Sequence, residues 1–501
     1  MNKKKYVQKN EMTAFCVAGL GQGMIYALMS SYISDYYLNV LQLAPMFVLL
    51  LMLLARVWDA INDPLMGIIV DRSNLKSGKM IPFIRFALIP IAAVTILMYL
   101  SPDLDKTQLM IYSAIVYVAW GMLYTVGDVS FWGLPNVMTP DSEERSSVIS
   151  VSKIFNSIGS AVPEVLFLVV GLIMAAVVEN AAEPMDALTV QKKKYLIMAI
   201  VTVGLGTVLY AVSCFGVKER IRMPARKRQP GEPSQLKRIF TCKPLILVLL
   251  MGVLSAGRYM VGAAAIHVAR YSFYIGPDLT TLLTEAERIA AVEASISTVK
   301  TVFQISSIVG LFGATLFMPK LMKKFDYKKL VIVSCLAGFL ASIVTTLVGW
   351  FTMNLYACIP FIIISCIPLG VINTVCFAMI CDCLDYMELK TGFRDNALGA
   401  ACQGFINKIG NAFATSGIVV MYMIIGLKPE QMLSSSAVVA ATEMPDNLRF
   451  AMFTLVSIVP GISMLLCSIP MFFYDLTGEK KKQVIADLAV FRKERGIDVA
   501  D

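Results

Sequence analysis

Long apolar stretches recur along the whole chain, separated by short polar or charged segments. A helix that crosses a lipid bilayer needs about 20 predominantly apolar residues. The pattern predicts twelve such helices, at 12–38, 43–70, 80–100, 108–138, 146–178, 195–216, 241–273, 296–318, 329–350, 355–386, 397–426 and 448–474. Glycine, proline or a charged residue interrupts several of them, which membrane helices tolerate where they face protein or water. We therefore expect an all-α polytopic membrane protein.

The predicted helices form two sets of six on either side of a basic, proline-containing segment. We expect an N-terminal half, a cytoplasmic linker, a C-terminal half and a cytoplasmic tail, at 1–216, 217–240, 241–475 and 476–501. Each half has a basic loop between its second and third helices, DRSNLKSGK in the first and KLMKKFDYKK in the second. Two six-helix halves around a site near the membrane midplane are typical of secondary transporters.

Composition and charge support this interpretation and add an orientation. Of the 501 residues, 57% are hydrophobic and 16% are charged, whereas a soluble domain is nearer half apolar and a quarter charged. Most of the 44 Lys and Arg lie at the N-terminus and in alternate loops, which places both termini in the cytoplasm of a plasma (inner) membrane protein. The net charge of +9 is then a topology signal, and we expect no nucleic-acid partner.

The cytoplasmic tail carries its own weak pattern. Val484, Leu488 and Phe491 recur at helical spacing among basic residues, which predicts a short helix on the cytoplasmic leaflet.

Patterns of enzymes and resident cofactors are missing from the sequence. The single histidine, His267, allows no histidine-based cluster, and the eleven cysteines show no zinc-binding spacing. No phosphate-cradling loop, nucleophile elbow or dinucleotide motif occurs. We therefore predict that the protein is not an enzyme and has no catalytic residues and no cofactor.

The second predicted helix contains charges that cost about 2.5–3.5 kcal/mol each at mid-bilayer. Arg56, Asp59 and Asp63 share one helical face, with Asn62 beside them. Two carboxylates and an amide offer oxygens to a monovalent cation, Na⁺, Li⁺ or H⁺, and Arg56 would hold the acids together when the cation is absent. The alternative is a structural ion-pair network that braces the helix.

The fourth and fifth predicted helices also carry polar residues at helical spacing. Thr125, Asp128 and Trp132 lie on one face of the fourth, where a carboxylate beside an aromatic ring suits a sugar with its hydroxyls and its C–H face. Lys153 and Glu164 share a face of the fifth, about 16 Å apart. Asp128 could instead pair with a neighbouring helix.

The seventh and eleventh predicted helices add two basic residues. Lys408 lies between Asn407 and Asn411, after Gln403, and could neutralise an acid when the cation leaves or simply brace the bundle. Arg258 in the seventh receives no role from its sequence context.

These segments resemble the glycoside–pentoside–hexuronide:cation symporters, a melibiose-permease-like family with the major facilitator superfamily fold. The most specific stretches are ARVWDAINDPLMGIIVDRS (55–73), GDVSFWGLPNVM (127–138), CDCLDYMELKTGFRDNA (381–397) and QGFINKIGNAF (403–413). The resemblance runs over most of the chain, and three of these stretches contain polar residues discussed above.

The resemblance implies a role for each polar residue. The implied cation ligands are Asp59, Asn62, Asp63 and Thr125, and the implied sugar-facing residues are Asp128, Trp132, Lys153 and Gln403. Lys408, together with Arg56, would couple the two sites.

Three positions depart from the family pattern. Ala18 and Gly19 stand where the family's sugar-binding Lys-Asp pair is expected, and Asn373 stands where a tryptophan is expected. The cation half of the site therefore matches the family, whereas the sugar half differs. We hypothesise that Glu164 supplies the missing carboxylate; the alternative is that Glu164 pairs with Lys153 through water or lies buried and protonated.

The resemblance implies a monomeric secondary transporter in the lipid bilayer. It would carry a sugar, glycoside, pentoside or uronide together with Na⁺, H⁺ or Li⁺ by alternating access. Two alternatives stay open at this point: a cation-coupled transporter of lysolipids or other amphiphiles with the same fold, and a carrier-like sensor that does not transport.

Overall fold

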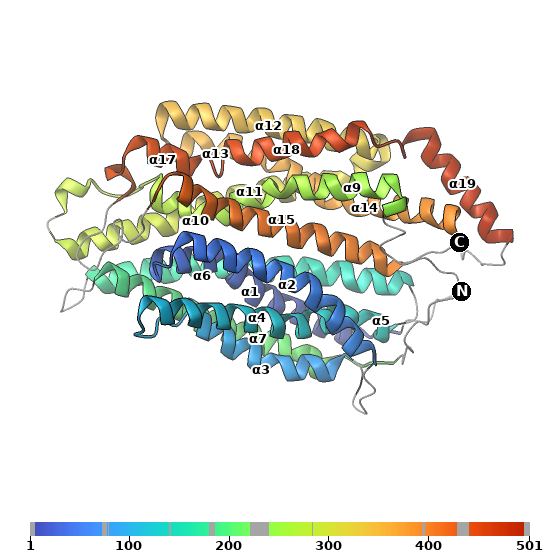
Figure 1. Cartoon of the computed structure of the whole chain (residues 1–501), viewed down its shortest axis with the longest axis horizontal. Coiled ribbons are helices and arrows are strands. Elements are labelled where there is room, and N and C mark those ends of the chain that lie inside the picture. The colour runs from blue at the N-terminus through green and yellow to red at the C-terminus, as the bar shows by residue number, and fades with distance from the viewer. Residues whose placement is uncertain are drawn as a thin grey trace. The chain divides into compact units, whose positions relative to one another are not determined.

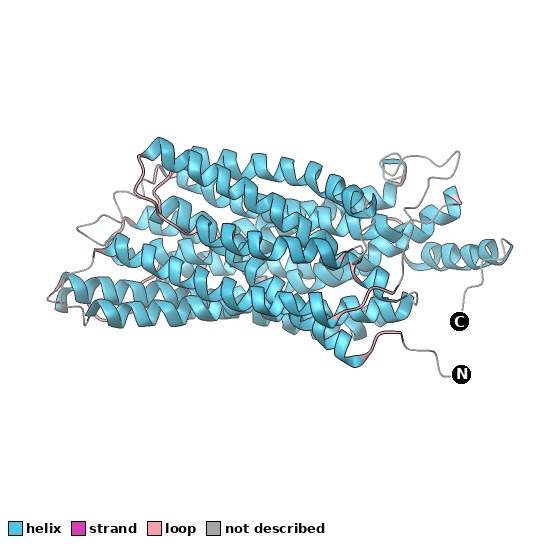
Figure 2. Ribbon diagram, turned by 90° about the horizontal axis from the view of Figure 1, so that it is seen from below, coloured by secondary structure: helices cyan, strands magenta, loops and turns pink. Residues whose placement is uncertain are grey.

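All regular elements in the described residues are helical (Figure 2). In this computed structural model the described residues are 6–72, 78, 80–139, 142–179, 186–220, 240–282, 284–392, 396–427 and 440–494. Ten helices or helix pairs within them are long and apolar enough to cross a membrane. The two remaining predicted spans are occupied by the long helices α2 and α15. The predicted all-α class is confirmed.

Among the residues that the structure describes, the N-terminal half contributes seven α-helices and one π-helical turn (Figure 1). They are α1 (Lys9–Asp35), η1 (Tyr36–Val40), α2 (Pro45–Arg72), α3 (Ile81–Met98), α4 (Lys106–Gly133), α5 (Pro135–Met138), α6 (Ser142–Glu179) and α7 (Ala187–Gly216).

The remainder of the chain contributes further membrane-length helices and a C-terminal helix (Figure 1). They are α9 (Lys243–Leu254), η2 (Ser255–Tyr259), α10 (Met260–Tyr271), η3 (Leu279–Thr281), α11 (Glu285–Lys324), α12 (Tyr327–Thr352), α13 (Leu355–Ser365), α14 (Ile367–Thr391), α15 (Asn396–Ile424), η4 (Ala441–Glu443), α17 (Asp446–Phe453), α18 (Ile458–Phe472) and α19 (Gly478–Glu494).

Several of the predicted continuous spans are broken in the described residues; the span at 448–474, for example, is divided between α17 and α18. The span at 355–386 is divided between α13 and α14, and Pro368 lies at the start of α14, where a missing N–H costs least. The span at 241–273 is divided by the 3₁₀ segment η2. There, Ser463 Oγ accepts from the Gly257 N–H at 2.8 Å and donates to the Leu254 carbonyl at 2.6 Å, so a side chain of α18 satisfies the backbone at the break.

The helices lie in two compact units that do not coincide with the predicted halves. Unit 1 comprises Met1–Lys227, Tyr274–Thr301 and Tyr422–Ala440, and unit 2 comprises Arg228–Phe273, Val302–Met421 and Ala441–Asp501. The first part of α11 belongs to unit 1 and its second part belongs to unit 2, and the predicted division at 217–240 stays a prediction.

Close contacts between α1 and α6 depend on glycine. A Cβ atom at Gly159 would lie 2.0 Å from the Leu20 carbonyl oxygen, and one at Gly23 would lie 2.2 Å from the Asn156 carbonyl oxygen. Small residues let membrane helices approach closely where no hydrophobic effect drives them together. This packing aligns the polar side chains of α1 and α6.

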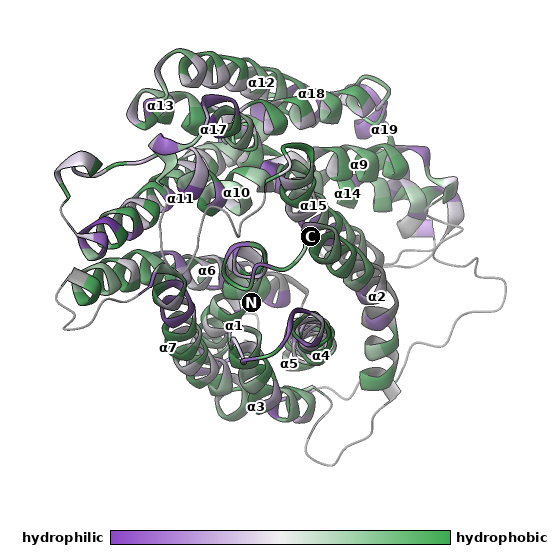
Figure 3. Ribbon diagram, turned by 60° about the vertical axis from the view of Figure 1, so that its left-hand side comes forward, coloured by the Kyte–Doolittle hydropathy of each residue, from purple (hydrophilic) through white to green (hydrophobic). Residues whose placement is uncertain are grey.

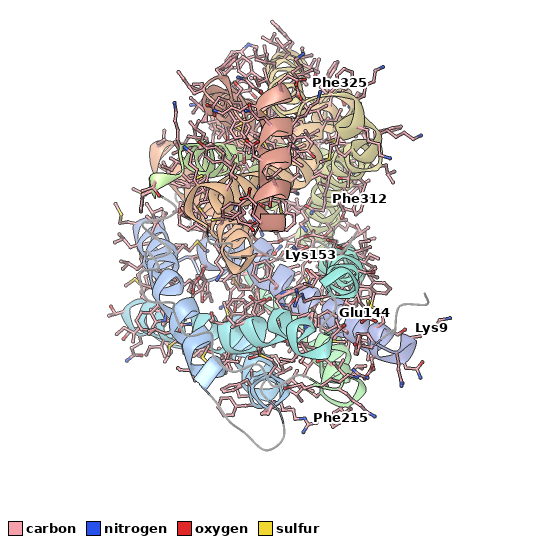
Figure 4. All side chains as sticks on the ribbon, turned by 90° about the vertical axis from the view of Figure 1, so that its right-hand side faces the viewer. Lys9, Glu144, Lys153, Phe215, Phe312 and Phe325 are labelled. Atoms are coloured by element: carbon pink, nitrogen blue, oxygen red, sulfur yellow. The ribbon has the colours of Figure 1, made fainter. Side chains whose placement is uncertain are left out.

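Large apolar side chains cover much of the outer surface of each unit. Phe86, Phe215 and Phe351 are 66%, 82% and 79% exposed, and Figure 3 shows the long helices predominantly hydrophobic. Phe215 and Phe312 project outward in Figure 4. Surfaces this apolar are expected where a protein faces lipid rather than water.

The C-terminal helix α19 is present as predicted, but its apolar face covers protein. Val484 belongs to the hydrophobic core of unit 2, and Leu488 is 3% exposed. Lys481 forms an ion pair with Asp382 of α14 at 2.6 Å. The predicted placement on the membrane leaflet is therefore wrong for this face of the helix.

Candidate functional site

A polar cluster in unit 1 joins α1, α4 and α6 around Gln22. Gln22 Nε2 donates to Asp128 Oδ1 at 2.5 Å and lies 3.0 Å from the Tyr124 hydroxyl. Asn156 Nδ2 in turn donates to Gln22 Oε1 at 2.7 Å. We call these four residues, Gln22, Tyr124, Asp128 and Asn156, the Gln22 cluster. It is a hydrogen-bonded set of carboxylate, amide and phenol groups inside a membrane-spanning bundle, of the kind that binds hydroxylated solutes.

Aromatic rings border the Gln22 cluster on α4. Tyr124 stacks on Trp120 with ring centroids 4.6 Å apart, and Tyr26 of α1 lies 5.5 Å from Tyr124. Trp132, one turn beyond Asp128, packs edge-on against Phe131 at 5.2 Å and keeps part of its surface exposed. Aromatic residues of α4 therefore lie on both sides of Asp128 in the chain, and the sugar-facing role of Asp128 and Trp132 stays a prediction.

The region of the missing Lys-Asp pair is filled by helix packing. Ala18 is fully buried, and the Gly19 carbonyl accepts a hydrogen bond from Asn156 at 3.0 Å. A Cβ atom at Gly19 would lie 2.6 Å from Ser152 Oγ. No larger side chain fits at Gly19 without moving α6, so α1 presents Gln22, one turn further along, in place of a charged pair.

Lys153 is the predicted basic contact on α6. Its side chain is exposed and emerges from α6 one turn before Asn156 of the Gln22 cluster.

Part of the predicted cation site lies beside α4. Asp59 approaches Gly121 so closely that a Cβ atom there would be 3.3 Å from Asp59 Oδ1. Thr125 is buried one turn along α4, and Asn62 has a buried Nδ2 without a hydrogen-bond partner. The side chains of Arg56 and Asp63 lie outside the described residues. Asp59 therefore lies close to α4 one turn from Thr125, and the cation assignment stays a prediction.

Glu164 has a different partner from those that the sequence suggested. Its carboxylate forms a buried ion pair with Lys300 of α11 and accepts a hydrogen bond from the Tyr32 hydroxyl at 2.8 Å. Lys300 also lies over the Tyr32 ring, 4.1 Å from its centroid. The expectation that Glu164 faces the substrate stays a prediction, but the cation that holds it here is Lys300 rather than Lys153.

A second buried ion pair fixes the same part of α11. Lys194 of α7 pairs with Glu293 and donates to Ser297 Oγ at 3.0 Å, and Gln191 donates to Glu293. Together with the pair at Glu164, it explains why the first part of α11 belongs to unit 1.

The predicted residues of unit 2 lie in a separate polar cluster. Asn407 Oδ1 accepts from Gln403 Nε2 at 3.1 Å and from the Tyr259 hydroxyl at 3.0 Å. Lys408 is half-buried on α15, and the Asn373 side chain is exposed on α14. The structure brings Gln403 into this cluster, whereas among the described residues no hydrogen bond or ion pair joins Asn373 to it.

Sequence reasoning missed three residues of the Gln22 cluster, namely Gln22, Tyr124 and Asn156. A signal was available, because Gln22 and Asn156 are uncharged polar residues inside apolar spans. Their importance depends on the α1–α6 contact, which sequence spacing alone does not specify.

Comparison with known proteins agrees with this architecture. The model of the MFS/sugar transport protein family matches residues 14–278 and 290–478. The uncharacterized symporter YjmB of Bacillus subtilis is 25% identical over 97% of this chain and 96% of its own length. The glucuronide carrier protein homolog of Escherichia coli is 22% identical over 95% and 94%, respectively.

A solved structure shows the same fold. The inward-facing, unoccupied crystal structure of a bacterial homolog of the human lysosomal transporter Spinster matches with a TM-score of 0.56, at 12% identity, over 96% of this chain and 99% of that one. The family match covers nearly the whole chain and both polar clusters. This chain therefore belongs to the MFS/sugar transport protein family, and the symporter resemblance noted in the sequence is confirmed.

Proposed function

We propose that the protein is a secondary transporter that moves a saccharide together with a monovalent cation. The observation that carries this proposal is the Gln22 cluster, where Asp128 is held by an amide network beside aromatic rings. Carboxylates and amides bind sugar hydroxyls, and rings bind the apolar face of a sugar. The relatives support a sugar cargo, because they are named as a symporter and as a glucuronide carrier homolog.

The proposed cation site is Asp59, Asn62, Asp63 and Thr125, with sodium as the favoured ion. Hard monovalent cations prefer oxygen ligands, and these residues offer carboxylate, amide and hydroxyl oxygens. Protons and lithium use the same groups. Arg56 and Lys408 are proposed to compensate the acidic charge when the ion is absent.

Helix α4 provides the physical link between the two proposed sites. Asp59 lies against Gly121, and Asp128 follows seven residues later, about 10 Å along the helix axis. Thr125 lies between them, one turn from each. A cation that orders this face of α4 would therefore also position Asp128, and linkage requires that sugar and cation strengthen each other's binding by the same factor.

Substrate contacts on the sugar side are proposed for Asp128, Trp132, Lys153, Gln403 and the Gln22 cluster. Asn373 has weaker support because no contact ties it to a polar cluster. We further propose a monomer in the plasma membrane with both termini in the cytoplasm, as the basic loops indicate.

A thermal-shift experiment on purified variants separates the two sites. A ligand that binds only the folded state raises the melting temperature by mass action. Asp128→Asn is expected to lose the shift caused by a saccharide and to keep the shift caused by sodium, whereas Asp59→Asn is expected to lose the sodium shift. Lys482→Gln, on the exposed side of α19, is the control and should keep both. Equal behaviour of the Asp59 and Asp128 variants would refute the assignment.

An amphiphile transporter is the outcome that the same screen would reveal. If sodium and a lysolipid shift the melting temperature, but no neutral or acidic saccharide does, the protein is an amphiphile transporter and the sugar proposal is refuted.

A further inference from the structure

Arg258 is a buried cation at the centre of a membrane-spanning segment. The span Lys243–Tyr271 has 29 residues, and Arg258 lies near its middle, in the 3₁₀ segment η2. Its relative exposure is 2%. A charge at this depth is costly unless it is paired or functional. A short 3₁₀ stretch within a longer helix often marks a functional hinge, and broken helices in transporters line binding sites.

The guanidinium of Arg258 is only partly satisfied. Nη2 donates to the Tyr259 hydroxyl at 2.8 Å and to Asn407 Oδ1 at 3.4 Å, which are both neutral groups. Nε and Nη1 are buried and have no hydrogen-bond partner. No salt bridge joins Arg258 to a carboxylate among the residues that the structure describes. Buried native charges are paired as a rule, so a missing partner calls for an explanation.

Two glutamines of unit 2 are also incompletely satisfied. Gln403 Oε1 and Gln304 Oε1 are buried acceptors without a donor. Gln403 is linked to Arg258 through Asn407, which accepts hydrogen bonds from both. Gln304 faces Gly262, one turn after Arg258, where an added Cβ atom would lie 3.6 Å from Gln304 Oε1. We call Arg258, Tyr259, Gln304, Gln403 and Asn407 the Arg258 cluster.

The donors and acceptors of this cluster that lack a hydrogen-bond partner indicate the chemistry of a ligand. The free Nε and Nη1 groups are donors on a rigid, permanently charged fork that matches a carboxylate. The free amide oxygens are acceptors that match hydroxyl groups. One molecule that supplies both is a polyhydroxylated monocarboxylate.

We propose that Arg258 binds the carboxylate of an acidic saccharide, so that the transported substrate is a sugar acid such as a uronide. This inference rests on the proposed transport function and narrows its substrate class. Gln304 and Gln403 accept hydrogen bonds from hydroxyls of the same molecule. Because Arg258 is enclosed in this structure, the ligand enters when the helix opens at η2, where Ser463 of α18 bridges the interrupted backbone.

A matched pair of probes tests the proposal on the wild-type protein. 4-Nitrophenyl β-D-glucuronide and 4-nitrophenyl β-D-glucoside differ only in a carboxylate against a hydroxymethyl group, and free glucuronate and galacturonate extend the comparison to unsubstituted acids. Binding is measured by calorimetry in sodium. At least one acid is expected to bind about 10- to 100-fold more tightly than its neutral counterpart, the range for a charged hydrogen bond made or lost.

Variants then assign that preference to Arg258. Arg258→Gln is expected to remove the preference for the acid and to leave the sodium-induced thermal shift unchanged, whereas Arg258→Lys should retain part of it. Arg449→Gln is the matched control, because Arg449 is a partly buried arginine of unit 2 that pairs with Asp446 at 3.2 Å, away from the cluster. It should keep the full preference.

Several results would overturn the inference. One is equal affinity of the wild-type protein for the acidic and the neutral probe, and another is tighter binding of a sugar phosphate than of the carboxylate. A third is that Arg258→Gln loses affinity for the acidic and the neutral probe by the same factor. If Arg258→Gln does not fold, the wild-type comparison still decides the matter. Sodium-dependent binding of neutral sugars alone would refute only the acidic substrate, while no response to any saccharide would also refute the proposed function.

Discussion

The buried ion pair between Glu164 and Lys300 offers a strong test of how α11 is held in unit 1. The two side chains are 6% and 1% exposed, and the Tyr32 hydroxyl donates to the same carboxylate at 2.8 Å. Lys300 also lies 5.0 Å from the centre of the Phe167 ring. The perturbations are Lys300→Met, Glu164→Gln and the double variant.

The expected magnitudes follow from the burial of both partners. Removing one member of a buried pair leaves an uncompensated charge and costs about 3–5 kcal/mol, whereas replacing both by neutral groups of similar size is often close to neutral. Each single variant should therefore be strongly destabilised. The double variant should be more stable than either single variant, with a coupling energy of roughly 3 kcal/mol or more between the two sites, at the upper end of the usual range for contacting residues.

Thermal unfolding of the purified protein in detergent measures this order. Lys482→Gln serves as the control, because Lys482 pairs with Glu479 on the exposed side of α19 and its loss should leave the melting temperature unchanged. The reasoning would be refuted if the single variants unfolded at the temperature of the wild type. It would also be refuted if the loss of stability in the double variant equalled the sum of the losses in the two single variants.

Three further predictions concern helix packing and the polar cluster. Gln22→Leu removes the donor that holds the α4 carboxylate, so saccharide affinity should fall about 10-fold in calorimetry while sodium binding persists; an unchanged affinity would exclude Gln22 from the site. Gly159→Leu should lower the melting temperature strongly because its Cβ would lie 2.0 Å from backbone, whereas Gly204→Ala, with no atom within 4 Å, should not; equal effects would contradict the α1–α6 packing. Val484→Asp should destabilise unit 2 by about 2 kcal/mol or more because the residue is 8% exposed, and Ile485→Asp, at a site 52% exposed, should not; the reverse order would return α19 to the lipid surface.

The apolar pattern predicts the helices well because bilayer thickness sets their length. It fails where a side chain from another helix satisfies the backbone, as Ser463 does beside Gly257. A 12-residue helix, a 3₁₀ turn and a second helix have the same apolar composition as one long helix. Periodicity therefore predicts the span at 241–273 but not its interruption.

The candidate sites show the same division between local and tertiary information. Thr125, Asp128 and Trp132 share a face because of their spacing, which the sequence states directly. The partner of Glu164 is Lys300, 136 positions away in the numbering, and no local pattern connects them. Long-range pairs of this kind, including the contact of Gln22 with Asn156, appear only once the helices are packed.

Saccharide affinity measured with and without sodium tests the central claim most directly. Calorimetry of the purified protein would compare binding of glucuronate, galacturonate and their neutral counterparts in sodium and in choline buffers, and then measure sodium binding with and without the saccharide that binds. We predict that sodium strengthens saccharide binding and that the saccharide strengthens sodium binding by the same factor. Saccharide binding that is indifferent to sodium, lithium and pH would contradict cation-coupled transport by this protein.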